Sequence, residues 1–218
     1  MLRLKRGMDL KKYNISTRQD ILNIAAPLFK EHGYDGTTLK MISDKLGLAA
    51  HSVIAHHFKN KRGVVKAILD EFVHSIREYI RGIMPEDTNE YTLVCIEHIY
   101  ICREVMSIKN KWRVFYHDEN IALWKELSFI EDEYRAITKQ FQKGFTEEEI
   151  RMAALMDLAA RLRLLEEHDQ GRLTCRDFCY YLSYLIGIHS RLDEATIQKN
   201  IKLAFEIADK NVPAIHFL

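Results

Sequence analysis

Apolar residues recur every three or four positions along most of the chain, which is the spacing of one buried face on an α-helix. The first such stretch begins at Thr17, whose spacing to Asp20 resembles a capping box, and ends at Gly33. A second, short helix is predicted from Thr38 to Gly47, and a third at about residues 50–57. Three short helices are therefore predicted at the front of the chain, with apolar positions that include Ile21, Leu22, Ala25, Leu28, Phe29, Leu39, Ile42 and Leu46.

Longer helices are predicted behind these three. Asn60 can cap a fourth helix that continues until Pro85 stops it. The segment at about 89–109 is apolar nearly all round, which is typical of a helix surrounded by other helices. Thr146 and Thr174 begin two further capping boxes. The predicted fold class is all-α, a three-helix head followed by a helical bundle, with later helices at about 111–117, 119–143, 146–169, 174–191 and 193–210.

Charge divides the chain in the same place as the helix pattern. Residues 1–62 carry 12 Lys and Arg against 5 Asp and Glu, a net charge of +7, whereas the remainder carries 20 against 26, or −6. A basic head on an acidic body suits a protein that docks one end onto a polyanion. We therefore expect two domains, a basic head at 1–62 and a helical body at 63–218.

Composition narrows the protein class further. With 218 residues and 47% apolar content, the chain can bury a substantial core. Its apolar runs are shorter than the roughly 18–20 residues that span a bilayer, and four cysteines are too few for a disulfide scaffold. We expect a cytoplasmic protein with reduced thiols and no membrane partner.

Two short helices joined by a tight turn that contains glycine are the arrangement of a helix-turn-helix DNA-binding unit. The first helix crosses the phosphate backbone, and the second, here at about 50–57, enters the major groove. Thr38 at a helix N-terminus, Lys61 and Arg18 are predicted to contact phosphates. Further phosphate contacts are expected from the basic arm formed by Lys5, Arg6, Lys11 and Lys12.

The head also resembles the TetR/AcrR-type family of bacterial transcription regulators over residues 17–69. The resemblance implies a double-stranded DNA operator, a small-molecule effector bound in the body, and a homodimer formed through the last two helices. It thus implies a repressor released from its operator by that effector. The positions that match the family's DNA-reading residues are Ala50, His51, Ser52, Val53, Ala55 and His56. The motifs that carry the resemblance are Thr17-Arg18-x-x-Ile21-Leu22-x-x-Ala25, Leu28-Phe29-x-x-x-Gly33-Tyr34-x-x-Thr37-Thr38-x-x-x-Ile42-Ser43, Leu46-Gly47-Leu48 and His56-His57-Phe58-x-x-Lys61.

Three features depart from the family pattern. One extra residue lies between Gly47 and Phe58, and Ala55 stands where a tyrosine is common. The reading surface is also poor in the Arg, Lys, Asn and Gln side chains that recognise base edges best. Pro27 lies inside the first helix and is expected to kink it. The weak reading surface leaves open an alternative function, a ligand-binding or interaction module with degenerate DNA reading.

The effector pocket is predicted from aromatic and titratable side chains of the body. An apolar cavity lined by aromatic rings is the usual form of a small-molecule site, although single aromatics are more often core. Phe72 and Tyr79 on the fourth helix would couple the ligand to the head. The other expected pocket residues are His98, Tyr100, Cys102, Trp112, Phe115 and Trp124.

Histidines and cysteines allow two interpretations each. Cys95, His98 and Cys102 share one face of a predicted helix, so they are either a thiol or metal sensor or small core residues, and core packing is favoured. Packing is likewise favoured for Cys175 and Cys179. His51 and His56 are expected to contact DNA, and His57 to pack in the head.

The last two predicted helices carry more apolar surface than one thin body covers, which favours a two-fold partner. An all-α enzyme is the competing class. The sequence contains no phosphate-binding glycine loop, no nucleophile elbow and no metal-ligand spacing, so neither catalysis, a cofactor nor a metal is expected. The acidic runs 131–133 and 147–149 are interpreted as solvated helix faces. Expected dimer residues are Phe178, Tyr181, Leu182, Leu185, Ile188, Ile197, Ile201, Leu203 and Ala204.

Overall fold

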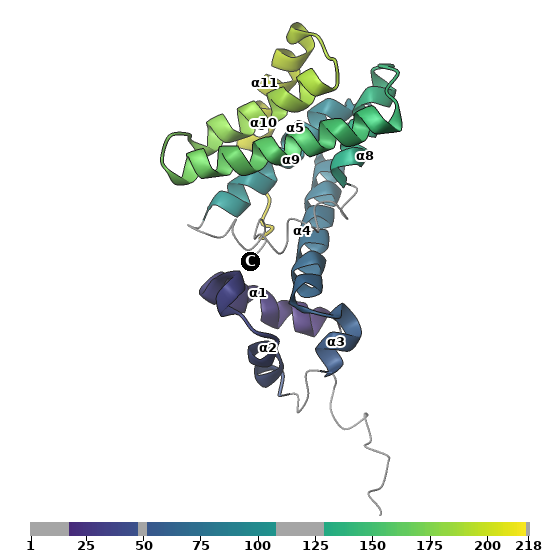
Figure 1. Cartoon of the computed structure of the whole chain (residues 1–218). Helices are drawn as coiled ribbons and strands as arrows, with labels where there is room; N and C mark the ends of the chain where they lie inside the picture. Colours follow the sequence, from purple (N-terminus) through teal and green to yellow (C-terminus); the bar gives the residue numbers. More distant parts are fainter. Residues whose placement is uncertain (1–17, 48–51, 108–128, 217–218) are drawn as a thin grey trace, which may run out of the picture.

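A computed structural model gives the structure of residues 18–47, 52–107 and 129–216. These residues form helices and turns and contain no strand, which confirms the all-α prediction. Figure 1 shows a small head of three helices, a long fourth helix that leaves it, and a bundle into which that helix runs. Among the described helices, none is long and apolar enough to cross a membrane.

The head consists of α1 (Arg18–Gly36), α2 (Leu39–Lys45) and α3 (Ser52–Phe58). The predicted end of the first helix is visible at Gly33, whose backbone leaves the helical region at φ 70° and ψ −177°. Pro27 lies on the exposed side of α1, and the non-helical dihedrals within this helix occur at Gly33. The helix therefore breaks at the predicted glycine, which accepts a positive φ, whereas the backbone dihedrals at Pro27 stay helical.

The helix α4 (Lys61–Ile83) joins the head to the body. Asn60 caps it as predicted, because its side chain accepts a hydrogen bond from the backbone N–H of Gly63 at 2.9 Å. One face of α4 is buried along its whole length. The proposed domain boundary at residues 62 and 63 falls in the first turn of this helix, so the helix belongs mechanically to both parts.

The body contains α5 (Glu90–Met106), α8 (Phe129–Gln140), α9 (Glu147–Asp169), α10 (Cys175–His189) and α11 (Glu194–Lys210). The central helix is α5, which packs against α4, α8, α10 and α11 and is buried on nearly every side, as its apolar sequence predicts. The two capping boxes predicted in the body are present, at the starts of α9 and α10, whereas Thr17, the first residue of the third, lies outside the described residues. The predicted helix at 111–117 lies outside the described residues.

Candidate DNA-binding head and buried polar cluster

The turn between α1 and α2 is held by a buried threonine. The hydroxyl of Thr37 lies 3.1 Å from the carbonyl oxygen of Leu28 and 2.7 Å from that of Gly33. The neighbouring Thr38 is exposed and caps α2, because its hydroxyl accepts from the N–H of Met41 at 3.1 Å. The two threonines therefore fix where the second helix of the head begins and which end of it faces outward.

The third helix of the head presents a small and weakly polar outer surface. Ile54 and Phe58 are buried on its inner side, whereas Ala55, His56 and His57 are exposed. The packing role expected for His57 is therefore wrong, because its ring lies on the outside between the rings of His56 and Phe58. Val53 is half-buried, while Ala50, His51 and the Ser52 side chain lie outside the described residues.

Two cations expected at DNA phosphates have partners within the protein. Arg18 forms an ion pair with Glu71 on α4 and lies 5.6 Å from the centre of the Phe58 ring. Lys61 donates to the carbonyl oxygen of Tyr34 at 2.9 Å and lies 4.0 Å above that ring. Since both contacts join α4 or α3 to α1, these side chains hold the head together in addition to any contact with DNA.

A cationic hollow lies where α3 meets α4. It has a volume of about 440 Å³ and is lined by Arg18, Lys59, Arg62 and Lys66 together with the acid Asp70. Lys66 pairs with Asp70 at 2.8 Å. Lys59, Arg62 and Lys66 were not predicted from the sequence as DNA contacts, although Lys59 and Arg62 flank Lys61 closely enough to suggest the patch. Such a concentration of positive charge is what a phosphate backbone binds.

The joint between the head and α4 depends on a close approach at Gly63. A side-chain Cβ built at this position would lie 1.9 Å from the carbonyl oxygen of Phe58, the last residue of α3. Real Cβ atoms do not approach backbone that closely, so a glycine is required here. The first turn of α4 and the end of α3 are consequently locked against each other.

The body contains a buried cluster of charged side chains, here called the polar cluster, formed by Arg77, Glu97, His98, Glu133, Asp157 and Arg161. It joins four helices, because Arg77 lies on α4, Glu97 and His98 on α5, Glu133 on α8, and the last two on α9. Four of its charged side chains, Glu97, Glu133, Asp157 and Arg161, are at most 5% exposed. Buried charge on this scale requires close pairing.

Distances within the polar cluster show how the charges are matched. The Nε of Arg77 donates to both carboxylate oxygens of Glu97 at 2.9 Å, and its Nη2 lies 3.5 Å from Glu133. Arg161 donates from Nε to Asp157 at 2.8 Å, and its Nη2 lies 2.9 Å from Nε2 of His98. The same imidazole nitrogen is 3.2 Å from Glu133. Arg77 is thus the link between this cluster and the helix that enters the head.

Burial changes the protonation of two members of the polar cluster. Burial raises the pKa of Glu133 to about 7, with Arg161 and Arg77 acting against it. Burial, reinforced by Arg161, lowers the pKa of His98 to about 3, so the imidazole is neutral near pH 7. Within residues 18–47, 52–107 and 129–216, Nδ1 of His98 and Oδ1 of Asp157 have no hydrogen-bond partner. The cluster is therefore imperfectly satisfied, which is unusual for buried polar groups.

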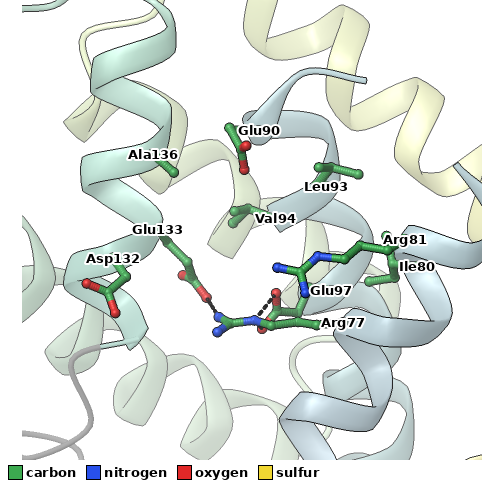
Figure 2. Close-up of a pocket in the computed structure, with 10 residues that line it drawn as sticks. All are labelled: Arg77, Ile80, Arg81, Glu90, Leu93, Val94, Glu97, Asp132, Glu133 and Ala136. Carbon is green, nitrogen blue, oxygen red and sulfur yellow. Dashed lines mark hydrogen bonds and ion pairs between the residues drawn. The ribbon is translucent and has the colours of Figure 1, made fainter. Parts of the chain in front are cut away.

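A pocket opens beside the polar cluster between α4, α5 and α8. Its volume is about 240 Å³, and Figure 2 shows Arg77 stretched between Glu97 and Glu133 along one side of it. Two arginines and four carboxylates line it, together with four apolar side chains, so it is not the aromatic cavity expected from the sequence. The lining residues are Arg77, Ile80, Arg81, Glu90, Leu93, Val94, Glu97, Asp132, Glu133 and Ala136.

The head is similar to known bacterial regulatory proteins. The family model for bacterial regulatory proteins of the tetR family matches residues 21–68, which cover most of α1, all of α2 and α3, and the beginning of α4. Residues 21–68 are therefore similar to the tetR family of bacterial regulatory proteins. The repressor KstR2 of Mycolicibacterium smegmatis is 26% identical over 153 residues, covering 67% of this chain and 73% of that protein. KstR2 of Rhodococcus jostii is 39% identical over 67 residues, 31% of this chain and 32% of that one.

The similarity extends to the arrangement of the whole chain. The crystal structure of RolR without ligand superposes with a TM-score of 0.56 at 11% identity, covering 90% of this chain and 99% of that one. At this identity the comparison shows the fold alone. The arrangement of head and body is therefore similar to that of RolR.

The structure distributes the expected effector residues over several places. Tyr79 and Tyr100 pack edge to face with ring centres 5.8 Å apart, and Phe72 lines a different hollow beside α1. His98 is buried in the polar cluster, and Cys102 lies on the α5 face toward α10. These five residues thus face different neighbours on consecutive turns of α4 and α5. Trp112, Phe115 and Trp124 lie outside the described residues.

The expected dimer residues divide into two groups. Phe178, Leu182, Ile197, Ile201 and Ala204 are at most 2% exposed in the single chain, so they form its core and cannot supply the interface. This part of the expectation is corrected: α10 and α11 cover one another and α5. The remaining side chains are available, with Tyr181 47%, Ile188 45% and Leu203 39% exposed, and Leu185 half-buried. Sequence reasoning missed a second exposed apolar stripe on α9, formed by Met152, Leu155 and Met156.

Glu133 corrects the interpretation of the acidic run at 131–133. The first two residues of the run are at least partly exposed and bind Arg135, but Glu133 points into the body and is 4% exposed. Inside the body Glu133 pairs with Arg77 and Arg161, and neither pairing can be recognised from spacing along the chain. A sequence signal for the cluster is Glu97, a charge in the middle of a helix that is apolar nearly all round.

Proposed function

We propose that this TetR-family protein is a cytoplasmic, homodimeric repressor whose head binds an operator and whose body binds a small-molecule effector, with no catalytic step. The observation that carries the proposal is the three-helix head that matches the family model and bears the cationic hollow beside α3. The sequence similarity to KstR2 supports the family assignment, and the structural similarity to RolR supports the architecture.

Affinity for DNA is assigned mainly to phosphate contacts. The exposed described positions of α3, Ala55, His56 and His57, offer few groups that recognise base edges. Lys59 and Arg62 add positive charge at its C-terminal end. Phosphate contacts fix the orientation of a protein on DNA, and base contacts add specificity. We therefore expect moderate sequence preference on top of strong, salt-dependent binding.

The experiment is selection of bound fragments from random duplex DNA, followed by affinity measurements by fluorescence anisotropy. Enrichment of a two-fold symmetric site, bound at least about 10³-fold more tightly than random duplex, would support an operator-binding repressor. Binding that is equal for all duplexes would instead favour the module with degenerate DNA reading. Complete absence of binding at low salt would overturn both DNA-binding versions.

The effector is assigned to the pocket in Figure 2, because that pocket borders the one α4 side chain in the polar cluster, Arg77. A ligand that competes for Glu97 or Glu133 would release Arg77 and shift α4, which is locked to α3 at Gly63. A ligand can act only through a difference in affinity between the two arrangements. Arg77→Gln should then weaken the response to an identified effector. Arg81→Gln, at the pocket rim, should leave the contacts of Arg77 with Glu97 and Glu133 intact.

The homodimer is assigned to the exposed side chains of α10 and α11, with Tyr181 and Ile188 at its centre. A glutamate in place of Ile188 would bury an unpaired charge at this interface and should convert the dimer to a monomer in sedimentation experiments. Met156→Glu, a matched change on the exposed stripe of α9, separates the two surfaces. If Met156→Glu dissociates the dimer and Ile188→Glu does not, the interface lies on α9.

A further inference from the structure

Three of the four cysteines gather between α5 and α10. The thiol of Cys179 lies within hydrogen-bonding reach of Cys175, one turn earlier on α10, and of Cys102 on α5. The fourth, Cys95, is two turns from Cys102 along α5 and contacts Tyr91 and Ser183 instead. His98 points to the polar cluster, so the grouping expected from the sequence, Cys95 with His98 and Cys102, is replaced by a different one.

The three thiols differ in access and in acidity. Cys179 is 1% exposed and Cys102 7% exposed, whereas Cys175 is half-buried at the first position of α10. The hydrogen bond with Cys179 lowers the pKa of Cys175, and the positive charge of Arg103 acts in the same direction. Contacts with Cys102 and Cys175 raise the pKa of Cys179. The more accessible thiol is thus the more acidic one, and it lies against a protected thiol.

We propose that Cys175 and Cys179 form a peroxide-responsive thiol pair, with Cys175 as the attacking thiol and Cys179 as the resolving thiol. The Cys175 thiolate attacks one oxygen of hydrogen peroxide, the O–O bond breaks, and hydroxide leaves while a sulfenic acid forms. The Cys179 sulfur then attacks the sulfenic sulfur, the S–O bond breaks, and water leaves with the Cys179 proton. The two sulfurs lose two electrons, and the peroxide is reduced to water.

Closing the disulfide requires a local change in α10. Residues four apart on a helix have Cβ atoms about 5–6 Å apart, whereas a disulfide needs about 3.5–4.5 Å. Cys175 directly follows the N-cap Thr174, so only the first turn and its capping box with Asp177 must loosen. Oxidation therefore changes the structure at the start of α10. The thiol chemistry itself does not depend on DNA binding.

The experiment treats the full-length protein with a small excess of hydrogen peroxide and maps disulfides in non-reduced digests by mass spectrometry. The parent protein should form the Cys175–Cys179 disulfide. Cys179→Ser should stop at the Cys175 sulfenic acid, which dimedone traps. Cys175→Ser should lose its thiols at least about tenfold more slowly than the parent. Cys95→Ser is the matched control, because Cys95 is buried and outside the group, and it should behave as the parent does.

Several results would overturn the proposal. One is equal thiol loss in Cys175→Ser and the parent, and another is a disulfide that joins Cys102 or Cys95 in place of Cys175. Urea-unfolded protein is the reference if a variant folds poorly, because all thiols are equally accessible in the unfolded chain. If the folded parent shows no preference for Cys175 beyond the unfolded chain, the site does not exist.

Discussion

The head and the body of this protein are stabilised in different ways. Among the described head residues, the buried polar side chains are the uncharged Thr37 and Ser43, and the ion pair of Lys40 with Asp44 is exposed. The body instead buries a charged cluster that joins α4, α5, α8 and α9. A head built on close packing keeps its shape over a range of conditions, whereas a body built on matched charges responds to pH and to polar ligands.

The strongest test of this contrast removes one buried charge. Arg161→Met leaves the buried Asp157 without its arginine and Glu133 with Arg77 alone, so the free energy of unfolding should fall by about 3–5 kcal/mol, measured by urea denaturation. Lys40→Met breaks an exposed pair in the head and should cost less than about 0.5 kcal/mol. Comparable losses in the two variants would show that the buried cluster is not what holds the body.

Close packing in the head can be tested at Gly63. Gly63→Ala forces a Cβ toward the Phe58 carbonyl and should reduce the free energy of unfolding by about 1–3 kcal/mol, with amide exchange accelerated in α3. Gly82→Ala, on the same helix with open space around it, should stabilise the protein by about 0.5–1 kcal/mol. Destabilisation of both variants by the same amount would assign the effect to α4 in general.

The polar cluster predicts two opposed dependences of stability on pH. The folded pKa of Glu133, about 7, lies above its ordinary value of 4.5, so its contribution is complete below pH 4.5 and is lost as the pH rises to 7. The folded pKa of His98, about 3, lies below its ordinary 6.5, so its contribution is lost as the pH falls from 6.5 to 3. The parent protein should therefore show a weak net dependence between pH 4.5 and 6.5.

Variants separate the two contributions. In Glu133→Gln the histidine contribution remains, and the free energy of unfolding should rise with pH from 3 to 6.5. In His98→Asn the carboxylate contribution remains, and stability should fall from pH 4.5 to 7. Thermal unfolding over this range measures both slopes. If stability changes with pH in the same direction in both variants, Glu133 and His98 do not have opposite effects.

The smallest expected effect concerns the surface of the head. Arg62→Ala should lower the slope of log affinity against log salt by about one unit for every duplex tested, because one phosphate contact is lost. Arg163→Ala removes an exposed arginine from α9 in the body and should leave the slope unchanged. If both variants reduce the slope equally, the cationic hollow does not mark the DNA-binding side.

The sequence was informative about helices and less so about the sites between them. Caps at Asn60, Thr146 and Thr174 and the stop at Gly33 were recognisable because each depends on residues a few positions apart. The family resemblance identified the head for the same reason, since its motifs are local. The side of each helix was harder to assign. Residues 178 and 181 lie on one helix, yet only the second is exposed.

The polar cluster lay beyond sequence reasoning for a definite physical reason. Its contacts between helices join residues 20 to more than 50 positions apart, and only the packing of α4, α5 and α8 brings Arg77, Glu97 and Glu133 together. The pair of Asp157 and Arg161 has a local spacing of four, which on an isolated helix is typical of a solvated salt bridge. Burial, the property that gives these charges their importance, depends on tertiary structure alone.

The uninterrupted course of α4 has a consequence for the size of the motion that it transmits. Sixteen residues separate Lys61, which is held by Tyr34, from Arg77, which is held by Glu97. At about 1.5 Å per residue, this distance makes a lever arm of about 24 Å. A tilt of about 5° around Arg77 would then move the head by about 2 Å. In the proposed two-fold dimer the two arms swing in opposite senses, so the spacing between the reading helices would change by up to twice that amount.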